Sequence, residues 1–431
     1  MNRATGTPGQ TAVGMVLVAW FVTSVYYFYQ YMIRSAPAVM VPEMSAGLGL
    51  TAAGLAGVIG LFYYAYAPFS LVAGVAMDQL GPRRVVPIGC ATLAIGAILF
   101  STGDPTLASV GRFVQGAGGV FALIGAAYLA MTYLPATRAA TLIGLTQMFG
   151  MAGGSAGQFL VGPAIAGGLA WDRFWFLMGL IGLPIAVLLF VFIPKPQPKP
   201  ASTSGVPWWK DAGSAMKTVF LNPQSWLCGF IAGLFFIPTT IFDMVWGVRF
   251  LEEAHNMPYS VAVMRSAAVP FGWIIGCPLL GWLSDRLGRR KPVIVGAGVV
   301  LAGSLALILY GPRDLFPPFT LALVAGIASG AAMIPYTVIK EANRPEHGGT
   351  ATGVINFINF SFSALLGPVF AGLLARASGG GERGLEHYQL SFQPLIWGVL
   401  LAIVLALILR ETGSATRKAV AAPGLQPQSQ P

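Results

Sequence analysis

Charged residues are scarce in this chain. Only 9% of its 431 residues are Asp, Glu, Lys or Arg, while 55% are hydrophobic and the mean hydropathy is +0.72. A soluble globular domain carries about 25% charged residues. The composition therefore excludes a soluble protein and predicts an integral membrane protein.

Residues that hold metals or form disulfides are also few. The three cysteines lie in apolar runs at no paired or metal-ligand spacing, so we expect small buried hydrophobic side chains at Cys90, Cys228 and Cys277. The three histidines fall in predicted loops, and no pair has metal spacing. We expect no metal site and no cofactor.

Signatures of catalysis and of processing are missing as well. The sequence contains no nucleotide-binding loop, no nucleophile elbow and no carboxylate pair in helical register, which argues against an enzyme. No ATP-binding domain is recognisable, so ion or substrate gradients are the expected energy source. The N-terminus is too weakly basic for a signal peptide, and the first apolar run is too long for one.

Long apolar runs are abundant. A bilayer core about 30 Å thick needs about 20 apolar residues per helix, and twelve runs meet this requirement. They lie near 12–40, 52–76, 85–102, 107–131, 139–166, 174–193, 226–250, 261–283, 292–310, 317–340, 350–375 and 391–410. The expected fold is all-α, with twelve transmembrane helices in two six-helix bundles.

The runs divide the chain into five parts. We predict a cytoplasmic N-terminus (1–11), two six-helix bundles (12–193 and 226–410), a linker (194–225) and a disordered cytoplasmic tail (411–431). The linker is rich in Pro, Ser and Lys, with a short interfacial helix expected around Trp208 and Trp209.

Basic residues set the expected orientation. With both termini in the cytoplasm, 17 of the 25 Lys and Arg fall in cytoplasmic segments, five fall outside and three remain within the membrane. This distribution follows the positive-inside rule. It explains the net charge of +10 without nucleic acid as a partner.

One motif occurs twice, 207 residues apart. GVAMDQLGPRR follows the second run and GWLSDRLGRRK follows the eighth. Their glycines allow a tight turn and close helix approach, and their aspartates can pair with arginines or cap a neighbouring helix. The shared positions are Gly74, Asp78, Gly81, Arg83 and Arg84 in the first copy, and Gly281, Asp285, Gly288, Arg290 and Lys291 in the second.

This duplicated loop resembles the signature of the major facilitator superfamily. GRFVQGAGG, which contains Arg112 and Gln115, resembles the R-x-x-Q-G-x-G motif of that superfamily. The resemblance implies two bundles around one central pathway, alternating access by rocking of the halves, and a monomer. It also implies that the Asp78 and Asp285 loops form a cytoplasmic gate without touching substrate.

Arg34 lies within the first run, after the tyrosine-rich stretch YYFYQYMI. A charge at mid-bilayer normally faces protein or a water-filled cavity. The placement resembles the first helix of the organophosphate/phosphate antiporters, in which an arginine grips the substrate anion.

The resemblance fails in the seventh run. Those antiporters carry a second arginine upstream of a tryptophan, where this chain has Thr239 or Thr240 before Trp246, together with Asp243. A phosphate dianion prefers two bidentate cations. A carboxylate or zwitterion held by Arg34, with Asp243 carrying a proton, fits this sequence better, because low dielectric favours the protonated carboxyl group.

Each of these assignments has an alternative. Arg34 could pair with a neighbouring helix or reach outward to the membrane surface. Asp243 could be solvated, or could pair with Arg265. Arg112 resembles an arginine linked to proton handling, but it could instead orient its helix.

Isolated polar and aromatic residues suggest the rest of the lining. An unpaired amide in hydrocarbon is unfavourable, so such groups should point inward, toward a cavity or another helix. The predicted substrate-binding residues are Arg34, Tyr26, Tyr27, Gln30, Tyr64, Gln147, Trp246, Tyr336, Asn356 and Asn359.

The sequence thus predicts a proton-coupled symporter for a small organic anion in a bacterial inner membrane. Three alternatives stay open: organophosphate/phosphate exchange, efflux of a drug or siderophore, and a non-transporting membrane sensor.

Overall fold

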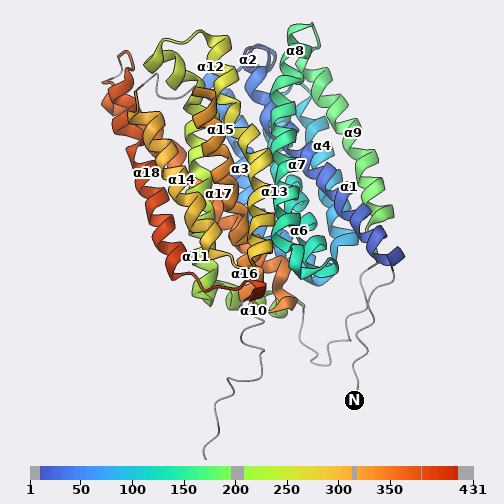
Figure 1. The fold of residues 1–431 in the computed structure, drawn as a ribbon. Coiled ribbons are helices and arrows are strands. Elements are labelled where there is room, and N and C mark those ends of the chain that lie inside the picture. Colours follow the sequence, from blue (N-terminus) through green and yellow to red (C-terminus); the bar gives the residue numbers. More distant parts are fainter. Residues whose placement is uncertain (1–9, 196–207, 313–317, 380, 416–431) are drawn as a thin grey trace, which may run out of the picture. The chain divides into compact units, whose positions relative to one another are not determined.

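The computed structural model describes residues 10–195, 208–312, 318–379 and 381–415. Every regular element in these ranges is a helix (Figure 1). The predicted N-terminus up to residue 9, the linker from 196 to 207 and the tail from 416 lie outside the described residues. Helices are expected throughout, because only intrahelical hydrogen bonds satisfy the backbone of a single span in lipid.

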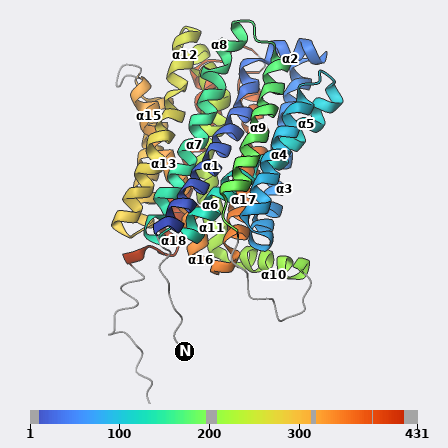
Figure 2. The same cartoon turned by 90° about the vertical axis from the view of Figure 1, so that its right-hand side faces the viewer.

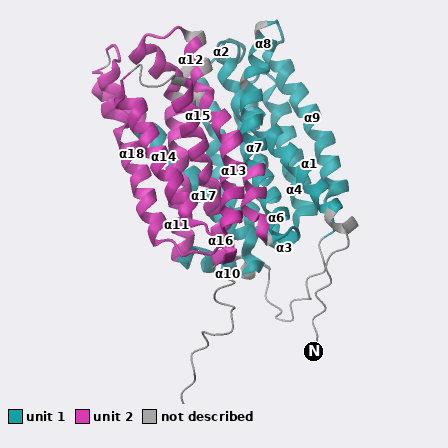
Figure 3. Cartoon of the chain, in the orientation of Figure 1, with its two compact units in different colours: residues 1–135, 146–222, 343–369 teal, residues 136–145, 223–342, 370–431 magenta. Residues whose placement is uncertain are grey.

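The chain forms two compact units (Figure 3). The N-terminal unit comprises 1–135, 146–222 and 343–369, and the C-terminal unit comprises 136–145, 223–342 and 370–431. The division differs from the two predicted halves, because the start of the fifth span belongs to the C-terminal unit and most of the eleventh belongs to the N-terminal unit.

Elements that lie in the N-terminal unit, wholly or in large part, begin with a long tyrosine-rich helix. They are α1 (Gln10–Ser35), η1 (Ala36–Val39), α2 (Val41–Leu48), α3 (Ala52–Leu80), α4 (Pro82–Phe100), α5 (Pro105–Gly119), α6 (Phe121–Tyr133), α7 (Ala139–Phe159), α8 (Val161–Ala166), α9 (Trp171–Phe192), α10 (Trp208–Leu221), η6 (Pro345–His347) and α17 (Gly348–Ala377).

In this unit α4 packs against α5 and α9, and α1 packs against α6 and α9 (Figure 2). Glycine makes the α4–α5 contact close: a Cβ at Gly111 would lie 2.7 Å from the Gly96 carbonyl oxygen. Small residues are the usual means of bringing helices together in lipid. The helix predicted around Trp208 is present as α10, which packs against α3.

Elements of the C-terminal unit include two stretches of π-helix in the seventh span. They are η2 (Ala136–Arg138), α11 (Pro223–Ile237), the π-helices η3 (Pro238–Gly247) and η4 (Phe250–Ala254), α12 (Tyr259–Ser266), α13 (Ala268–Leu287), α14 (Lys291–Tyr310), α15 (Pro318–Ser329), η5 (Gly330–Met333), α16 (Ile334–Ala342) and α18 (Leu385–Ile408). Here α13 packs against α15, and α14 packs against α18.

Ten segments of the described chain are long and apolar enough to cross a membrane. The predicted fifth and eighth spans correspond to α7, with 21 residues, and α13, with 20 residues. Together these segments give the predicted twelve-helix fold.

The predicted tail begins with residues that have defined contacts. The Glu411 carboxylate accepts hydrogen bonds from the backbone N–H groups of Arg290 (2.7 Å) and Lys291 (3.1 Å), at the start of α14. Thr412 donates to Glu341 at 2.6 Å. The prediction of disorder from residue 411 is therefore wrong for these two residues.

Candidate functional site

Arg34 lies one residue before the end of α1 and is 9% exposed. Three rings surround its guanidinium group, with the Tyr31, Tyr63 and Phe360 centroids 4.8, 4.9 and 4.9 Å from Cζ. Its Nε donates to the Tyr63 hydroxyl at 3.1 Å. These contacts, which we call the Arg34 cage, hold the cation by hydrogen bonding and cation–π attraction.

The cage leaves the charge uncompensated. No described carboxylate lies within 4.0 Å of Arg34, and its buried Nη1 has no hydrogen-bond partner among the described residues. An unpaired buried charge is costly. The arrangement is therefore suited to a ligand that brings a negative charge.

A short polar chain continues from the cage along α1. The Tyr27 hydroxyl donates to Gln147 Oε1 at 2.9 Å, and Gln147 Nε2 donates to the Tyr31 hydroxyl at 3.4 Å. Two predicted residues thus reach Arg34 through Tyr31, a residue that the sequence analysis did not single out. Gln30 is fully buried, and neither atom of its amide has a hydrogen-bond partner in the described part of the chain.

The tyrosine of α3 that contacts Arg34 is Tyr63, whereas Tyr64 was the one predicted to line the site. Tyr63 contacts Arg34, whereas Tyr64 is 67% exposed and lies outside the cage. Neighbouring residues on a helix point about 100° apart, so only one of the two can face Arg34. Phe360 was missed as well. The available signal was its position four residues after Asn356, which places both on one face of α17.

Replacing Tyr63 by Phe removes the hydrogen bond that holds the Arg34 guanidinium group in place. Anion binding to this group should weaken about 10-fold or more, because a hydrogen bond to a charged group contributes about 1.5–3 kcal/mol. Tyr64→Phe, one residue away and outside the cage, is the matched control and should leave binding unchanged. Equilibrium binding to the purified variants measures both. Equal effects of the two substitutions would contradict the geometry.

Arg112 binds the backbone that carries Arg34. It is fully buried and makes four hydrogen bonds. Three go to the carbonyl oxygens of Ile33, Arg34 and Ile59, and one of 2.7 Å goes to Gln115 Oε1. This pattern fits the alternative in which Arg112 orients helices, because its side chain joins the last turn of α1 to Ile59 in the N-terminal part of α3.

We predict that Arg112→Gln lowers the melting temperature by on the order of 5 °C, because buried carbonyl groups lose their donors. The pH profile of residual transport should keep its shape. Thermal unfolding and uptake at several pH values test this, with exposed Arg173→Gln as the control. An intact melting temperature with an altered pH profile would assign proton handling to Arg112 instead.

Other predicted residues have contacts or surroundings of their own. Tyr26 donates to the Gly118 carbonyl at 2.6 Å and so joins α1 to α5. Asn356 donates to Ser70 at 2.8 Å and joins α17 to α3. In the C-terminal unit, the Trp246 ring lies 5.4 Å from the Arg383 guanidinium. Tyr336 and Asn359 are buried in α16 and α17.

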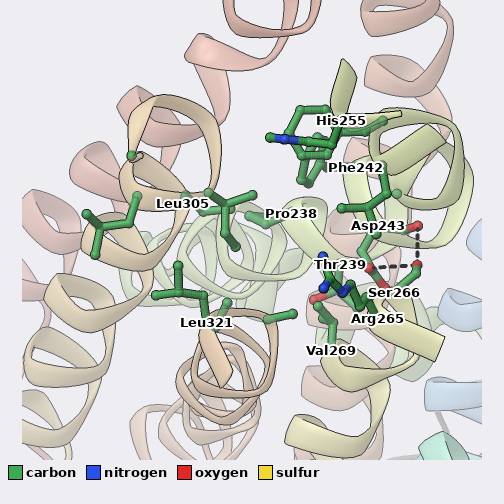
Figure 4. Close-up of a pocket in the computed structure, with 18 of the residues that line it drawn as sticks. Pro238, Thr239, Phe242, Asp243, His255, Arg265, Ser266, Val269, Leu305 and Leu321 are labelled. Carbon is green, nitrogen blue, oxygen red and sulfur yellow. Dashed lines mark hydrogen bonds between the residues drawn. The ribbon is translucent and has the colours of Figure 1, made fainter. Parts of the chain in front are cut away.

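Asp243 lies in the C-terminal unit, on the π-helix η3, and is 8% exposed. Ser266 donates to its Oδ1 at 3.0 Å. The alternative that Arg265 pairs with Asp243 is not seen, because no ion pair within 4.0 Å joins them in the described structure. Asp243 and Arg265 instead both line a cavity of about 560 Å³ (Figure 4).

The duplicated motif forms two equivalent contacts, one in each unit. Asp78 accepts hydrogen bonds from Gly349 N (2.7 Å), Thr350 N (2.6 Å) and the Thr350 hydroxyl (2.7 Å), at the start of α17. A Cβ at Gly74 would lie 2.6 Å from the Gly349 carbonyl oxygen, so glycine is required for this approach. We call this contact the Asp78 latch.

The second copy repeats this geometry. Asp285 accepts from Ala140 N (3.4 Å), Thr141 N (2.8 Å) and the Thr141 hydroxyl (2.8 Å), at the start of α7. It also pairs with Arg290 at 2.6 Å, and Arg290 pairs with Glu341 at 2.9 Å. We call this contact the Asp285 latch. Both aspartates cap a distant helix. Asp285 also has an arginine partner, Arg290.

The remaining motif residues fix the turns that carry the latches. Gly81 and Gly288 have positive φ angles of 79° and 62°, which glycine adopts without strain. Arg83 donates to the Ile193 carbonyl at 2.6 Å, and Lys291 donates to the Leu407 carbonyl at 2.7 Å. These contacts hold the basic residues against the ends of α9 and α18.

A twelve-helix membrane fold with two equivalent latches is typical of secondary transporters. The model of the Major Facilitator Superfamily matches residues 23–368, and the chain belongs to this superfamily. It is a multi-pass membrane transporter and not an enzyme.

Similar proteins have several roles. The probable sulfoacetate transporter SauU of Cupriavidus necator is 23% identical, with 88% of this chain and 89% of that protein covered. An MFS-type efflux pump of Mycolicibacterium smegmatis is 27% identical (80% and 81% covered). The membrane sensor protein UhpC of Escherichia coli is 24% identical (82% and 84% covered).

Solved structures share the fold. The transporter FucP in its outward conformation superposes with a TM-score of 0.73 at 15% identity, with 92% of this chain and 99% of that chain covered. At this identity the likeness shows the fold alone.

Proposed function

We propose that this chain is a secondary active transporter that takes up a small organic anion of the carboxylate type together with protons across a bacterial inner membrane. The observation that carries the proposal is the Arg34 cage, a buried guanidinium group without a described carboxylate partner. A bound anion compensates this charge and gives the site its selectivity for negative ligands.

The surroundings of Arg34 favour a carboxylate over a phosphate dianion. Arg112, which donates to the Arg34 carbonyl oxygen, uses its donors for carbonyl groups and Gln115, so it is a poor second half of a phosphate clamp. A single guanidinium matches a single carboxylate. The three rings around it suit a ligand with an apolar or hydroxylated body. One relative, the gentisate transporter of Corynebacterium glutamicum, has in its name an anion with one carboxylate on a hydroxylated ring.

Asp243 is the proposed proton carrier. It is buried, it accepts one hydrogen bond from Ser266, and it has no ion pair with Arg265. A buried carboxylate without a cationic partner takes up a proton more readily than one in water. In this proposal, alternating access opens and closes the two latches, with both termini on the cytoplasmic side.

Uptake into proteoliposomes tests the proposal. The purified protein should accumulate labelled gentisate or benzoate when an inward proton gradient is imposed, and should not exchange glucose 6-phosphate for phosphate. Exchange of the sugar phosphate would replace the carboxylate assignment. Binding of an anion with no flux in either direction would identify a sensor. Export of a lipophilic drug with no anion uptake would identify an efflux pump.

A further inference from the structure

The cavity in the C-terminal unit has opposite charges on one wall and aliphatic side chains on another. It is lined from the seventh span by Thr239, Phe242 and Asp243, and Figure 4 shows Asp243, Ser266 and Arg265 on one side, opposite Leu305 and Leu321. At about 560 Å³ it has the size of a small-molecule site. All its lining residues belong to the C-terminal unit, and none of them is a residue of the Arg34 cage.

The two charges face the same space without neutralising each other directly. Asp243 receives a hydrogen bond from Ser266, whereas Arg265 Nη1 donates to the Met257 sulfur, a weak acceptor. Within the described residues no ion pair of 4.0 Å or less involves either group. An anion alone would leave Asp243 uncompensated, and a cation alone would leave Arg265 uncompensated. A zwitterion compensates both.

The backbone of the seventh span is also unusual at this place. Asp243 lies on ten residues of π-helix, Pro238–Gly247. Such segments are rare and frequently occur at functional sites. Gly247, one turn further, also lines the cavity, and a Cβ there would lie 3.0 Å from Asp243 Oδ1 and 2.8 Å from Ser266 Oγ. The glycine therefore keeps the space beside the carboxylate open.

We infer that this cavity binds a small zwitterion with an apolar body, of the class of the aliphatic amino acids. The ligand ammonium group faces Asp243, its carboxylate faces Arg265, and its aliphatic part lies against Leu305 and Leu321. This second ligand site lies apart from the anion site that we propose at Arg34, but it shares Asp243 with the proposed proton pathway. It binds the zwitterion when Asp243 is ionised.

Three probes that differ by one group each test the inference. Leucine has both charges, 4-methylpentanoate lacks the ammonium group and 3-methylbutylamine lacks the carboxylate. Calorimetry on the purified full-length protein should show leucine binding at least about 30-fold more tightly than either analogue, as expected when a buried charge loses its partner. Equal affinity for leucine and 4-methylpentanoate, or no binding of leucine, would overturn the inference.

Variants locate the site. Asp243→Asn and Arg265→Gln should each weaken leucine binding at least about 30-fold, and Ala322→Phe, which fills the cavity and keeps both charges, should abolish it. Arg34→Gln should bind leucine normally, so a failure of the proposed anion transport is distinguishable from a failure of this inference. Loss of leucine binding in Arg34→Gln with retention in Ala322→Phe would place the ligand at the cage and refute the second site.

Discussion

Arg34→Gln is expected to abolish anion uptake, with a loss of at least about 100-fold, and to leave the protein folded. The guanidinium group is the one charge inside the ring of Tyr31, Tyr63 and Phe360, so the substituted site would offer an anion no counter-charge. Losing one partner of a buried charge pair costs about 2–5 kcal/mol, which corresponds to roughly 30- to 5,000-fold in affinity.

Two measurements separate binding from folding in this variant. Thermal unfolding in the presence of a panel of carboxylates should show stabilisation of the wild type and none of Arg34→Gln, because a ligand of the folded state raises its melting temperature. Arg34→Lys keeps the charge but loses the planar group between the rings, so an intermediate effect is expected. Ligand stabilisation that persists in Arg34→Gln would make Arg34 a structural residue.

Asp78→Asn is expected to slow transport by at least about 10-fold while anion affinity changes little. The carboxylate accepts three short hydrogen bonds at the start of α17. Asparagine keeps one acceptor oxygen, so the two bonds from the Thr350 N–H and hydroxyl to Oδ2 are lost, which destabilises the closed latch by on the order of 2–3 kcal/mol. Such a change shifts the equilibrium between the closed and the open latch by roughly 30- to 150-fold. Asp285→Asn should have a smaller effect, because all three of its distances are longer than the corresponding distances of Asp78, and Arg290 also contacts Glu341.

A matched control exists for this experiment. Asp104 also caps a helix, accepting from Leu107 N at 2.8 Å, but this helix, α5, follows it directly in the chain. Asp104→Asn should therefore leave transport unchanged, since asparagine caps a local helix equally well. Uptake rates and equilibrium binding of the three variants decide the matter. A fall in affinity with an unchanged maximal rate would contradict a conformational role for the Asp78 latch.

The sequence predicts that the duplicated motif forms a turn with a close helix approach. It does not predict which residues the two aspartates contact. The spacing of Gly74, Asp78 and Gly81 and its repeat at Gly281 indicate a turn and a close approach of helices. The sequence leaves open whether each aspartate pairs with an arginine or caps a helix. The structure shows capping in both copies and an arginine pair at Asp285. The sequence could not show this, because the capped helix is about 270 residues away in the first copy and about 145 in the second.

The residues around Arg34 were even harder to predict from the sequence. That Arg34 needs a compensating environment follows from one charge in an apolar run. The choice between Tyr63 and Tyr64 depends on the rotation of α3 about its axis, and a span with hydrophobic residues on all sides carries little periodic signal for that rotation. Phe360 joins the cage because α17 packs on α3 through Asn356 and Ser70, which no local pattern reveals.

The sequence by itself determined the membrane class, the twelve spans and the superfamily, because hydropathy, span length and the duplicated loop are local properties of the chain. Tertiary structure alone decided which rings enclose Arg34, that Arg112 binds carbonyl groups, and that Asp243 and Arg265 share a cavity without pairing. The physical reason is that these contacts join helices distant in the chain, and their rotation and depth are set by close packing.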